Sequence, residues 1–161
     1  MLYLLDANVL IDAERDYYPL DRVPQFWAWL VTRGAEGLIR IPVETLEEIS
    51  IGTDALAAWA KSNVVISALR FDEEVDPALV SRVVSVGYAS DLTDEEIDRV
   101  GRDPFLVAHA LVAPTARVVV TTERSAPSKQ RANRKLPDVC AGFGVSTNTT
   151  FGLIRLLDFR A

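Results

Sequence analysis

The sequence predicts a single α/β domain in which helices flank a central parallel sheet. The runs Leu2–Leu5 and Val118–Val120 are apolar without alternation, as expected for strands that are buried on both faces of a parallel sheet. Apolar residues at helical spacing fill most of the chain around them. The length of 161 residues suits one domain with its own core, and no repeat, low-complexity tract or linker divides it. We therefore expect a single domain over residues 1–161.

The composition is that of an ordinary soluble globular protein, with 49% hydrophobic and 25% charged residues. The one cysteine, Cys140, cannot form an internal disulfide and provides no thiol metal site, which favours a reducing, cytoplasmic location. The chain shows no signal-peptide pattern. No apolar stretch approaches the roughly 18 residues that span a bilayer, so we expect no membrane partner.

Strands and helices are placed in chain order by apolar spacing, capping residues and prolines. Strands are expected at residues 2–5, 38–41, 117–120 and 142–146, and residues 64–66 are expected to be a strand or extended. The first helix follows the first strand at once and ends before the break at Tyr17–Pro19. Further helices are expected over residues 24–33, 42–51, 54–61, 76–88, 93–100, 103–111 and 151–159. Thr93 and Glu96 form a capping box, which explains the acids there without a catalytic role.

Two groups of residues have a structural explanation. Trp27 and Trp29 lie at helical spacing with Phe26, which indicates core or a subunit contact. His109, the only histidine, lies six positions after Asp103 on another face of the same helix, so we expect it to have a structural role.

Carboxylates follow two of the predicted strands, at the point where each strand ends. Asp6 comes directly after the first strand, and Glu123 follows the strand at residues 117–120. In open α/β sheets, ligands bind in the crevice beyond the carboxyl ends of the strands. An equal alternative is that Asp6 or Asn8 only caps the first helix. Asp103 is a plausible N-cap of an almost wholly apolar helix, which would hold it rigidly.

Further acids lie in the helix expected over residues 42–51. Glu44 and Glu48 share one face of this helix, Glu47 lies beside them, and no lysine is mixed in. The candidate site therefore contains Asp6, Glu48, Asp103, and Glu123 or Asp138. Hard divalent cations take oxygen ligands, and converging carboxylates repel one another unless a cation neutralises them. A metal-dependent phosphodiester hydrolase fits this requirement.

The net charge of −6 argues at first sight against a nucleic-acid partner. If four of the 23 acids hold a metal, the remaining 19 nearly balance the 17 lysines and arginines. The segment 124–135 is locally basic and contains no acid, with the cations Arg124, Lys129, Arg131, Arg134 and Lys135. Such a loop can bind a phosphate backbone, although a solvated loop is an equal alternative.

Four segments, in this order and spacing, carry a resemblance to the PIN-domain family of ribonucleases. They are Leu4–Ile11 (LLDANVLI), Pro42–Ile49 (PVETLEEI), Asp103–Ala110 (DPFLVAHA) and Val119–Glu123 (VVTTE). The segment Leu136–Cys140 (LPDVC) looks like that of one branch of the family. The resemblance covers most of the chain. It implies a Rossmann-like fold, Mg²⁺ or Mn²⁺ in an acidic pocket, and cleavage of RNA.

The resemblance also assigns roles to single residues. Asp6 matches the first metal-binding aspartate, Asn8 the polar residue that orients it, Glu48 the helix glutamate and Asp103 the third acid. The fourth acid departs from the family, which usually has Asp or Asn two residues after the threonine of the strand. Either Glu123, preceded by Thr121 and Thr122, or Asp138 takes that place, and one or two metals remain possible.

Many members of this family are the toxins of type II toxin–antitoxin pairs, so the resemblance implies a small antitoxin partner and a homodimer. Tryptophans 27, 29 and 59 would suit dimer contacts. A second interpretation keeps the fold without catalysis, as a nucleic-acid or protein binding module, and is favoured by the irregular fourth acid. A phosphotransfer receiver domain ranks last because no strand-end lysine completes its pocket. Dinucleotide binding fails because no Gly-x-Gly-x-x-Gly turn follows the first strand.

Overall fold

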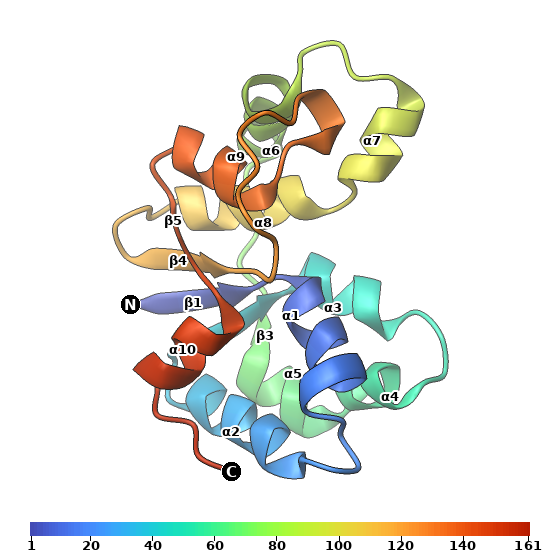
Figure 1. Cartoon of the computed structure of the whole chain (residues 1–161), viewed down its shortest axis with the longest axis vertical. Coiled ribbons are helices and arrows are strands. Elements are labelled where there is room, and N and C mark those ends of the chain that lie inside the picture. The colour runs from blue at the N-terminus through green and yellow to red at the C-terminus, as the bar shows by residue number, and fades with distance from the viewer.

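Five parallel strands form one sheet in the computed structural model, which describes all 161 residues. The strand order is β3-β2-β1-β4-β5 (Figure 1). The strands are β1 (Leu2–Leu5), β2 (Ile39–Pro42), β3 (Arg70–Phe71), β4 (Arg117–Val120) and β5 (Ser146–Asn148). All four neighbouring pairs are parallel. The predicted fold class, an α/β protein with a central parallel sheet flanked by helices, is confirmed.

The central strands are buried on both faces, as their unbroken apolar runs predict. Tyr3 and Leu5 of β1 pack into one apolar cluster, whereas Leu4 between them packs into a second. In β4 the same alternation sends Val118 and Val120 to the first cluster and Val119 to the second. The sheet is therefore the middle layer of three (Figure 1).

The first cluster is closed by the helices drawn below the sheet in Figure 1. They are α1 (Ala7–Asp12), which continues as the π-helical segment η1 (Ala13–Tyr17), then α2 (Pro24–Ala35), α3 (Val43–Ser50), α4 (Ala55–Lys61), α5 (Asn63–Leu69) and α10 (Thr150–Leu156). The second cluster lies above the sheet, under α6 (Pro77–Arg82), the π-helical segment η2 (Val83–Tyr88), α7 (Asp94–Val100), α8 (Asp103–Leu111), the short 3₁₀ segment η3 (Arg131–Asn133) and α9 (Leu136–Gly142).

Two strand predictions are wrong in position. Residues 64–66 lie in α5, because Val65 and Leu69, four positions apart, are both buried as on one helix face. The strand of that region is the two-residue β3, just after the helix. The last strand is β5 at Ser146–Asn148 and not residues 142–146. Its side chains are polar, so its place is set by backbone pairing with β4, which apolar spacing does not signal.

The tryptophans pack inside the chain. Trp27 is buried and donates through its indole N–H to the Tyr18 carbonyl at 2.7 Å. Its ring meets Trp59 edge-on at 4.8 Å between centroids. Trp29 is half-buried and packs against Phe159. Trp27 is therefore not available for the dimer contact suggested above, and core packing explains the aromatic group.

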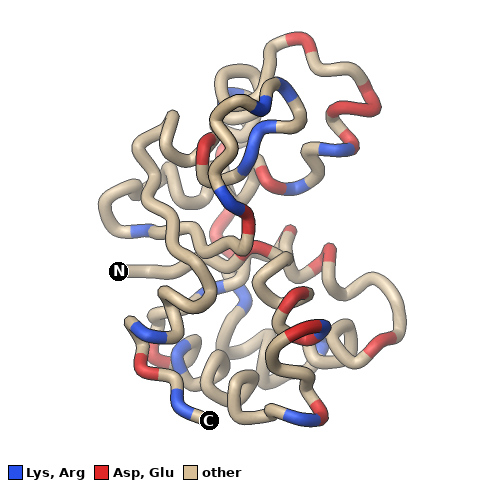
Figure 2. Tube along the Cα trace, in the orientation of Figure 1, with Lys and Arg blue, Asp and Glu red and all other residues tan.

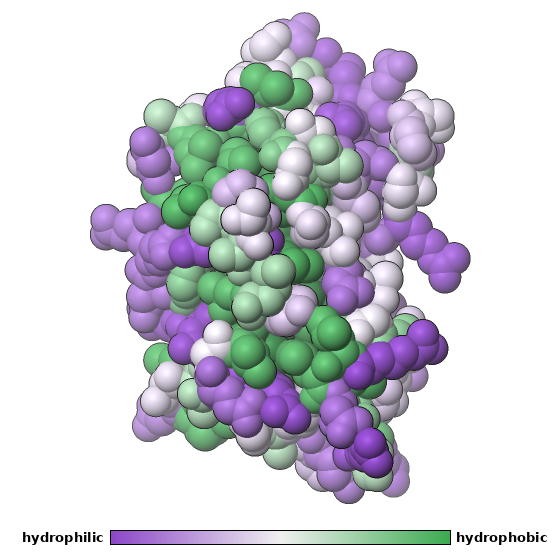
Figure 3. All heavy atoms as spheres, turned by 90° about the vertical axis from the view of Figure 1, so that its left-hand side faces the viewer, coloured by the Kyte–Doolittle hydropathy of each residue, from purple (hydrophilic) through white to green (hydrophobic).

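Charged residues are distributed unevenly over the chain. In Figure 2, acidic positions gather where the central strands end, and lysines and arginines occupy the loop just above them. Figure 3 shows the opposite side, toward the amino ends of the strands, where apolar side chains form a continuous stretch between polar ones. None of the helices combines the length and the apolar character of a membrane span.

Candidate functional site

The candidate site begins where the strand order reverses. After β1 the chain adds β2 and β3 on one side of it, then crosses over to place β4 on the other side. The crevice at such a switch point is the usual ligand site of an open parallel sheet. Leu5 of β1 pairs with Val120 of β4, so Asp6 and Thr121 leave the sheet at the same level. The Asp6 N–H still donates to the Val120 carbonyl, at 2.9 Å.

Asp6 is a buried carboxylate with a polar partner across the switch point. It is 4% exposed, and its Oδ2 accepts a 2.7 Å hydrogen bond from the Thr121 hydroxyl. It stands at the N-cap position of α1, but its side chain makes no capping hydrogen bond. Burial raises the pKa of Asp6 to about 6, and the charges of Glu123 and Glu48 add to the rise. The hydrogen bond to Thr121 and the raised pKa therefore set Asp6 apart from an ordinary helix cap.

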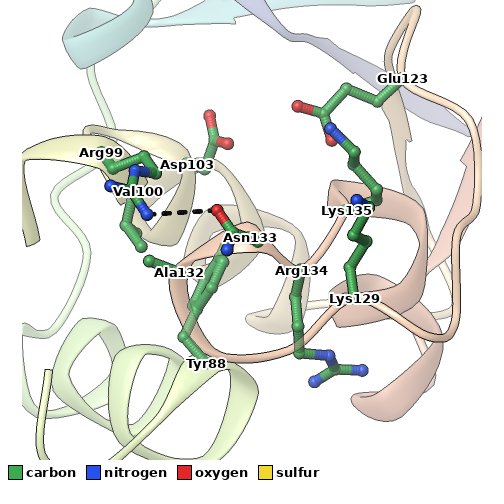
Figure 4. A pocket seen from close by; sticks show the side chains of 10 residues that line it. All are labelled: Tyr88, Arg99, Val100, Asp103, Glu123, Lys129, Ala132, Asn133, Arg134 and Lys135. Atoms are coloured by element: carbon green, nitrogen blue, oxygen red, sulfur yellow. Dashed lines mark hydrogen bonds between the residues drawn. The ribbon is translucent and has the colours of Figure 1, made fainter. Parts of the chain in front are cut away.

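Asp103 is the first residue of α8 and not its N-cap, because Arg102 occupies the cap position. The Asp103 carboxylate has no hydrogen-bond partner within the chain and points into an open cavity (Figure 4). Burial raises its pKa to about 8, and the charges of Asp6, Glu123 and Glu48 contribute in that order. This aspartate therefore holds its proton at a pH where an exposed aspartate is ionised.

Glu48 is the one acid of α3 that acts on both aspartates. Glu44 lies 3.1 Å from Nε2 of the fully buried His109, and Glu47 forms a 2.8 Å ion pair with Arg102. Glu48 is exposed and has no such partner, and its charge raises the pKa of Asp6 and of Asp103. His109 thus contacts Glu44 of α3 and does not line the cavity beside Asp103.

Glu123 is held in place from both of its ends. Its backbone N–H donates to the Thr121 hydroxyl oxygen at 3.1 Å, and its Oε2 accepts from the Leu136 N–H at 2.7 Å. The second contact ties the end of β4 to the start of α9. The charge of Glu123 raises the pKa of both Asp6 and Asp103. Thr121 therefore connects Asp6 and Glu123 through a single hydroxyl.

Asp138 lies apart from this group. Its carboxylate accepts hydrogen bonds from the Ser125 hydroxyl and from the Ala126 N–H, the latter at 2.8 Å. These bonds hold its pKa below the usual value, and it contributes nothing to the shifts at Asp6 and Asp103. The charges of Glu48 and Glu123 thus act on both Asp6 and Asp103, whereas the Asp138 carboxylate is engaged by the loop that follows β4.

The donor set suits a hard cation, although no three acidic, histidine or cysteine side chains stand close enough to enclose one. Mg²⁺ is commonly held by one or two carboxylates, with waters and substrate oxygens in its other positions. Asp6 is buried and Asp103 is half-buried, and the charge of Asp6 raises the pKa of Asp103, which is the environment that a cation relieves. The oxygen chemistry fits Mg²⁺ or Mn²⁺, and Glu48 and Glu123 supply further negative charge.

A cavity of about 260 Å³ opens beside Asp103. Asp103 and Glu123 face each other across it, with Lys129 and Lys135 on the Glu123 side (Figure 4). Neither lysine has a hydrogen-bond or ion-pair partner in the chain. Arg99 also lines this cavity and donates to the Asn133 side chain at 3.2 Å. We call this space the cationic lobe.

Two of the predicted basic residues have structural contacts instead. Arg131 pairs with Asp91 at 2.8 Å and with Glu96 at 3.0 Å, and does not line the cationic lobe. Arg134 donates to the carbonyls of Gly87 and Asp138, and its guanidinium turns away from Asp103 in Figure 4. Among the five predicted cations, Lys129 and Lys135 remain available at this lobe.

Tyr88 is a residue of the cationic lobe that the sequence did not reveal. It ends η2, is 8% exposed, and its hydroxyl is buried without a hydrogen-bond partner. Its ring extends into the lobe in Figure 4. Burial and the charge of Asp103 raise its pKa. In the sequence Tyr88 is only the last apolar position of a helical pattern, so no local signal could have marked it.

The remaining predicted residues lie on the other side of Glu123. Thr122 and Arg124 line a second cavity, of about 340 Å³, which Glu123 shares with the cationic lobe. The Arg124 side chain is exposed and has no partner in the chain. Asn8 is half-buried, and its backbone N–H lowers the pKa of Asp6. Glu123 thus lines both of these cavities, and also a third against the end of β5.

Comparison with known proteins gives a family match over nearly the whole chain. Residues 3–161 match the family described as Domain of unknown function (DUF4411). No curated protein and no solved structure matches the chain significantly. All the side chains of the site lie within the matched residues, as does the complete sheet apart from its first residue. The chain belongs to the DUF4411 family.

Proposed function

We propose that this protein is a metal-dependent endoribonuclease, which hydrolyses phosphodiester bonds of RNA. The observation that carries the proposal is that acidic and basic side chains lie next to each other at the switch point. Two carboxyl groups without a cationic partner, the buried Asp6 and the half-buried Asp103, interact electrostatically, and Asp103 lines a lobe with two unpaired lysines. The first environment suits a cation and the second suits a phosphate, and a phosphodiester hydrolase needs both.

Asp6 and Asp103 would hold the Mg²⁺ or Mn²⁺ ion, with Glu48 and Glu123 beside it. When bound, such an ion supplies an activated water and stabilises charge on the phosphoryl group. The Thr121 hydroxyl donates to one oxygen of Asp6 and so fixes the direction of the other. Glu123 is oriented by the Leu136 N–H, which leaves its second oxygen for a water or a ligand.

The cationic lobe supports binding of the substrate phosphates. Lys129 and Lys135 attract the backbone of a nucleic acid into a site whose net charge would otherwise repel it. The unpartnered Tyr88 hydroxyl is a neutral donor that stays protonated beside the carboxylates. A phosphate oxygen in the lobe would satisfy this buried hydroxyl, which otherwise costs about 1–3 kcal/mol to leave without a partner.

A second candidate function is a nucleic-acid binding module that does not cleave. It is favoured by the engagement of Glu123 with α9 and by the absence of any three side chains that enclose a metal. We also propose the antitoxin partner and the homodimer on the basis of the family resemblance alone. Size-exclusion chromatography with light scattering, and co-purification with a neighbouring small protein, test those two proposals.

Cleavage assays with matched variants separate the two functions. We would incubate single-stranded and structured RNAs with the wild type, with Mg²⁺, with Mn²⁺ and with a chelator. The nuclease proposal expects metal-dependent cleavage that is lost in Asp103→Asn and reduced in Glu48→Gln. Glu47→Gln, which changes the neighbouring acid of the same helix, is the matched control and keeps activity. RNA binding without cleavage in any metal would instead support the binding module.

A further inference from the structure

The second cavity has a different chemistry from the cationic lobe. It lies between the end of η1, the loop after β4 and the start of α10, and Glu123 forms the wall that the two cavities share. Its lining includes the aromatic rings of Tyr17 and Phe151 and the carboxylates of Asp12 and Glu123. Arg124 is its one cation. We call this space the aromatic lobe.

The two rings leave an apolar surface open to a ligand. Tyr17 and Phe151 are each 44% exposed, although aromatic residues of this size are mostly buried in a domain. They meet edge to face, with 5.1 Å between centroids and 72° between planes. In this arrangement one ring braces the other, and the face of at least one ring remains free for stacking.

The polar groups of the aromatic lobe favour a donor ligand over an anion. Asp12 already pairs with Arg15 at 2.9 Å and Glu123 already accepts from the Leu136 N–H, but each carboxylate keeps a second oxygen that can accept a hydrogen bond from a ligand N–H group. The Thr150 hydroxyl is buried, with 3% of the residue exposed, and has no hydrogen-bond partner in the chain. A ligand with a flat ring and edge N–H and C=O groups satisfies the rings, the carboxylates and this hydroxyl together.

We propose that the aromatic lobe binds one unpaired base of a nucleic-acid strand, which stacks on Phe151 and Tyr17 while N–H groups on its edge face Asp12 and Glu123. This subsite deepens the proposed function and rests on it, because the strand would then continue into the cationic lobe. A base within a duplex cannot reach such a cavity, so the lobe selects single-stranded segments. Sequence-tolerant stacking of this kind is the usual recognition mode for unpaired bases.

The test measures stacking and binding separately from cleavage. The probe is a single-stranded RNA of twelve nucleotides that carries 2-aminopurine, with a hairpin duplex of the same composition as the comparison, both in the presence of a chelator. Phe151→Leu keeps an apolar side chain but removes the aromatic face, and Phe151→Trp restores it. Ile97→Ala, at a residue of α7 that is 50% exposed, is the control for loss of surface apolar area.

We expect Phe151→Leu to weaken single-strand binding about tenfold, since one base–aromatic stack contributes roughly 1–3 kcal/mol. The 2-aminopurine quenching should be lost in that variant and recovered in Phe151→Trp, while hairpin binding stays the same in all variants. Equal affinities of wild type and Phe151→Leu for the single strand would overturn the base subsite, as would an equal loss for the hairpin.

Other outcomes distinguish the subsite from the nuclease. Phe151-dependent stacking without cleavage in any metal supports the base subsite and contradicts the proposed hydrolase. Cleavage that is unaffected by Phe151→Leu supports the hydrolase and overturns the base subsite. Conversion of a dimeric wild type to a monomer by Phe151→Leu would mean that a second copy of the chain covers the rings, which also overturns the base subsite.

Discussion

The Thr121 hydroxyl donates a 2.7 Å hydrogen bond to the Asp6 carboxylate and, at the same time, accepts one of 3.1 Å from the Glu123 N–H. These three residues leave neighbouring strands at the carboxyl edge of the sheet, and the one hydroxyl fixes the geometry between them. Thr121 itself is 1% exposed. Its side chain is therefore a positioning group for the acidic centre.

Replacing Thr121 with Val should disturb Asp6 more than the fold. The variant leaves one Asp6 oxygen without its donor, so the pKa of Asp6 should rise above its value of about 6. We expect a loss of about 1–3 kcal/mol in unfolding free energy at pH 8 and reduced RNA cleavage. Thr121→Ser keeps the hydroxyl and should retain both. Denaturant unfolding and the pH profile of cleavage measure these effects, and identical profiles for Val and Ser would contradict the positioning role.

The raised pKa of Asp103 predicts that the metal-free protein loses stability as pH rises. Below about pH 4 this carboxyl is protonated in both the folded and the unfolded chain. Between there and its folded pKa of about 8, the unfolded chain ionises first, so the folded state binds more protons and its stability falls with increasing pH. Asp6, with a pKa of about 6, adds to the fall in the lower part of this range.

Asp103→Asn should remove most of that dependence. Because the asparagine carries no charge to bury, we expect this variant to be more stable than the wild type by on the order of a few kcal/mol at pH 8, and equally stable near pH 4. Adding Mg²⁺ should stabilise the wild type at pH 8 and leave the variant nearly unchanged. Thermal unfolding over this pH range tests the prediction, which fails if the variant is the less stable protein at pH 8.

Glu123 combines a structural and a chemical role that two substitutions can separate. Glu123→Gln keeps an oxygen that can accept from the Leu136 N–H, whereas Glu123→Ala removes it. We expect Ala to cost about 1 kcal/mol or more in stability and Gln to cost little. Both should reduce cleavage if the charge acts on the metal. If Glu123→Gln is fully active, the role of Glu123 is restricted to its hydrogen bond with the start of α9.

The two free lysines should determine the salt dependence of RNA binding, and Arg131 should not. Each phosphate contact that is lost should lower the slope of log affinity against log salt by about 0.7 for a single strand. We therefore expect a shallower slope for Lys129→Ala and Lys135→Ala. Arg131→Ala, whose guanidinium is already paired with Asp91 and Glu96, serves as the control and keeps the wild-type slope. If Lys129→Ala and Lys135→Ala keep the same slope as Arg131→Ala, the cationic lobe is not the phosphate site.

Tyr88→Phe removes one hydroxyl from the cationic lobe. Because that hydroxyl is buried without a partner, its loss should leave stability unchanged or raise it by about 1 kcal/mol. If the hydroxyl donates to a substrate phosphate, RNA affinity and cleavage should both fall in the same variant. A gain in stability together with unchanged RNA binding and cleavage would assign Tyr88 to packing alone.

The sequence by itself determined the layers of the fold and the position of two acids. Unbroken apolar runs at β1 and β4, with apolar residues at helical spacing around them, predict a sheet covered on both faces. The spacing of apolar residues along the chain shows which faces of a strand or helix are buried. The same patterns place Asp6 at the end of β1 and Asp103 at the start of the apolar helix α8. The positions of β3 and β5 were not predicted correctly from the local sequence. Both strands are short and are defined by pairing with strands distant in sequence.

Only the tertiary structure shows which of the remaining acids are engaged by other partners. Three glutamates of α3 look alike in sequence, but His109 contacts Glu44 and Arg102 contacts Glu47, which leaves Glu48. The Asp138 carboxylate likewise accepts hydrogen bonds from Ser125 and Ala126, in the loop after β4. The unpartnered hydroxyls of Tyr88 and Thr150 are likewise visible only once distant segments enclose them. Competition for hydrogen-bond partners is a property of the folded chain, because it depends on contacts between residues far apart in sequence.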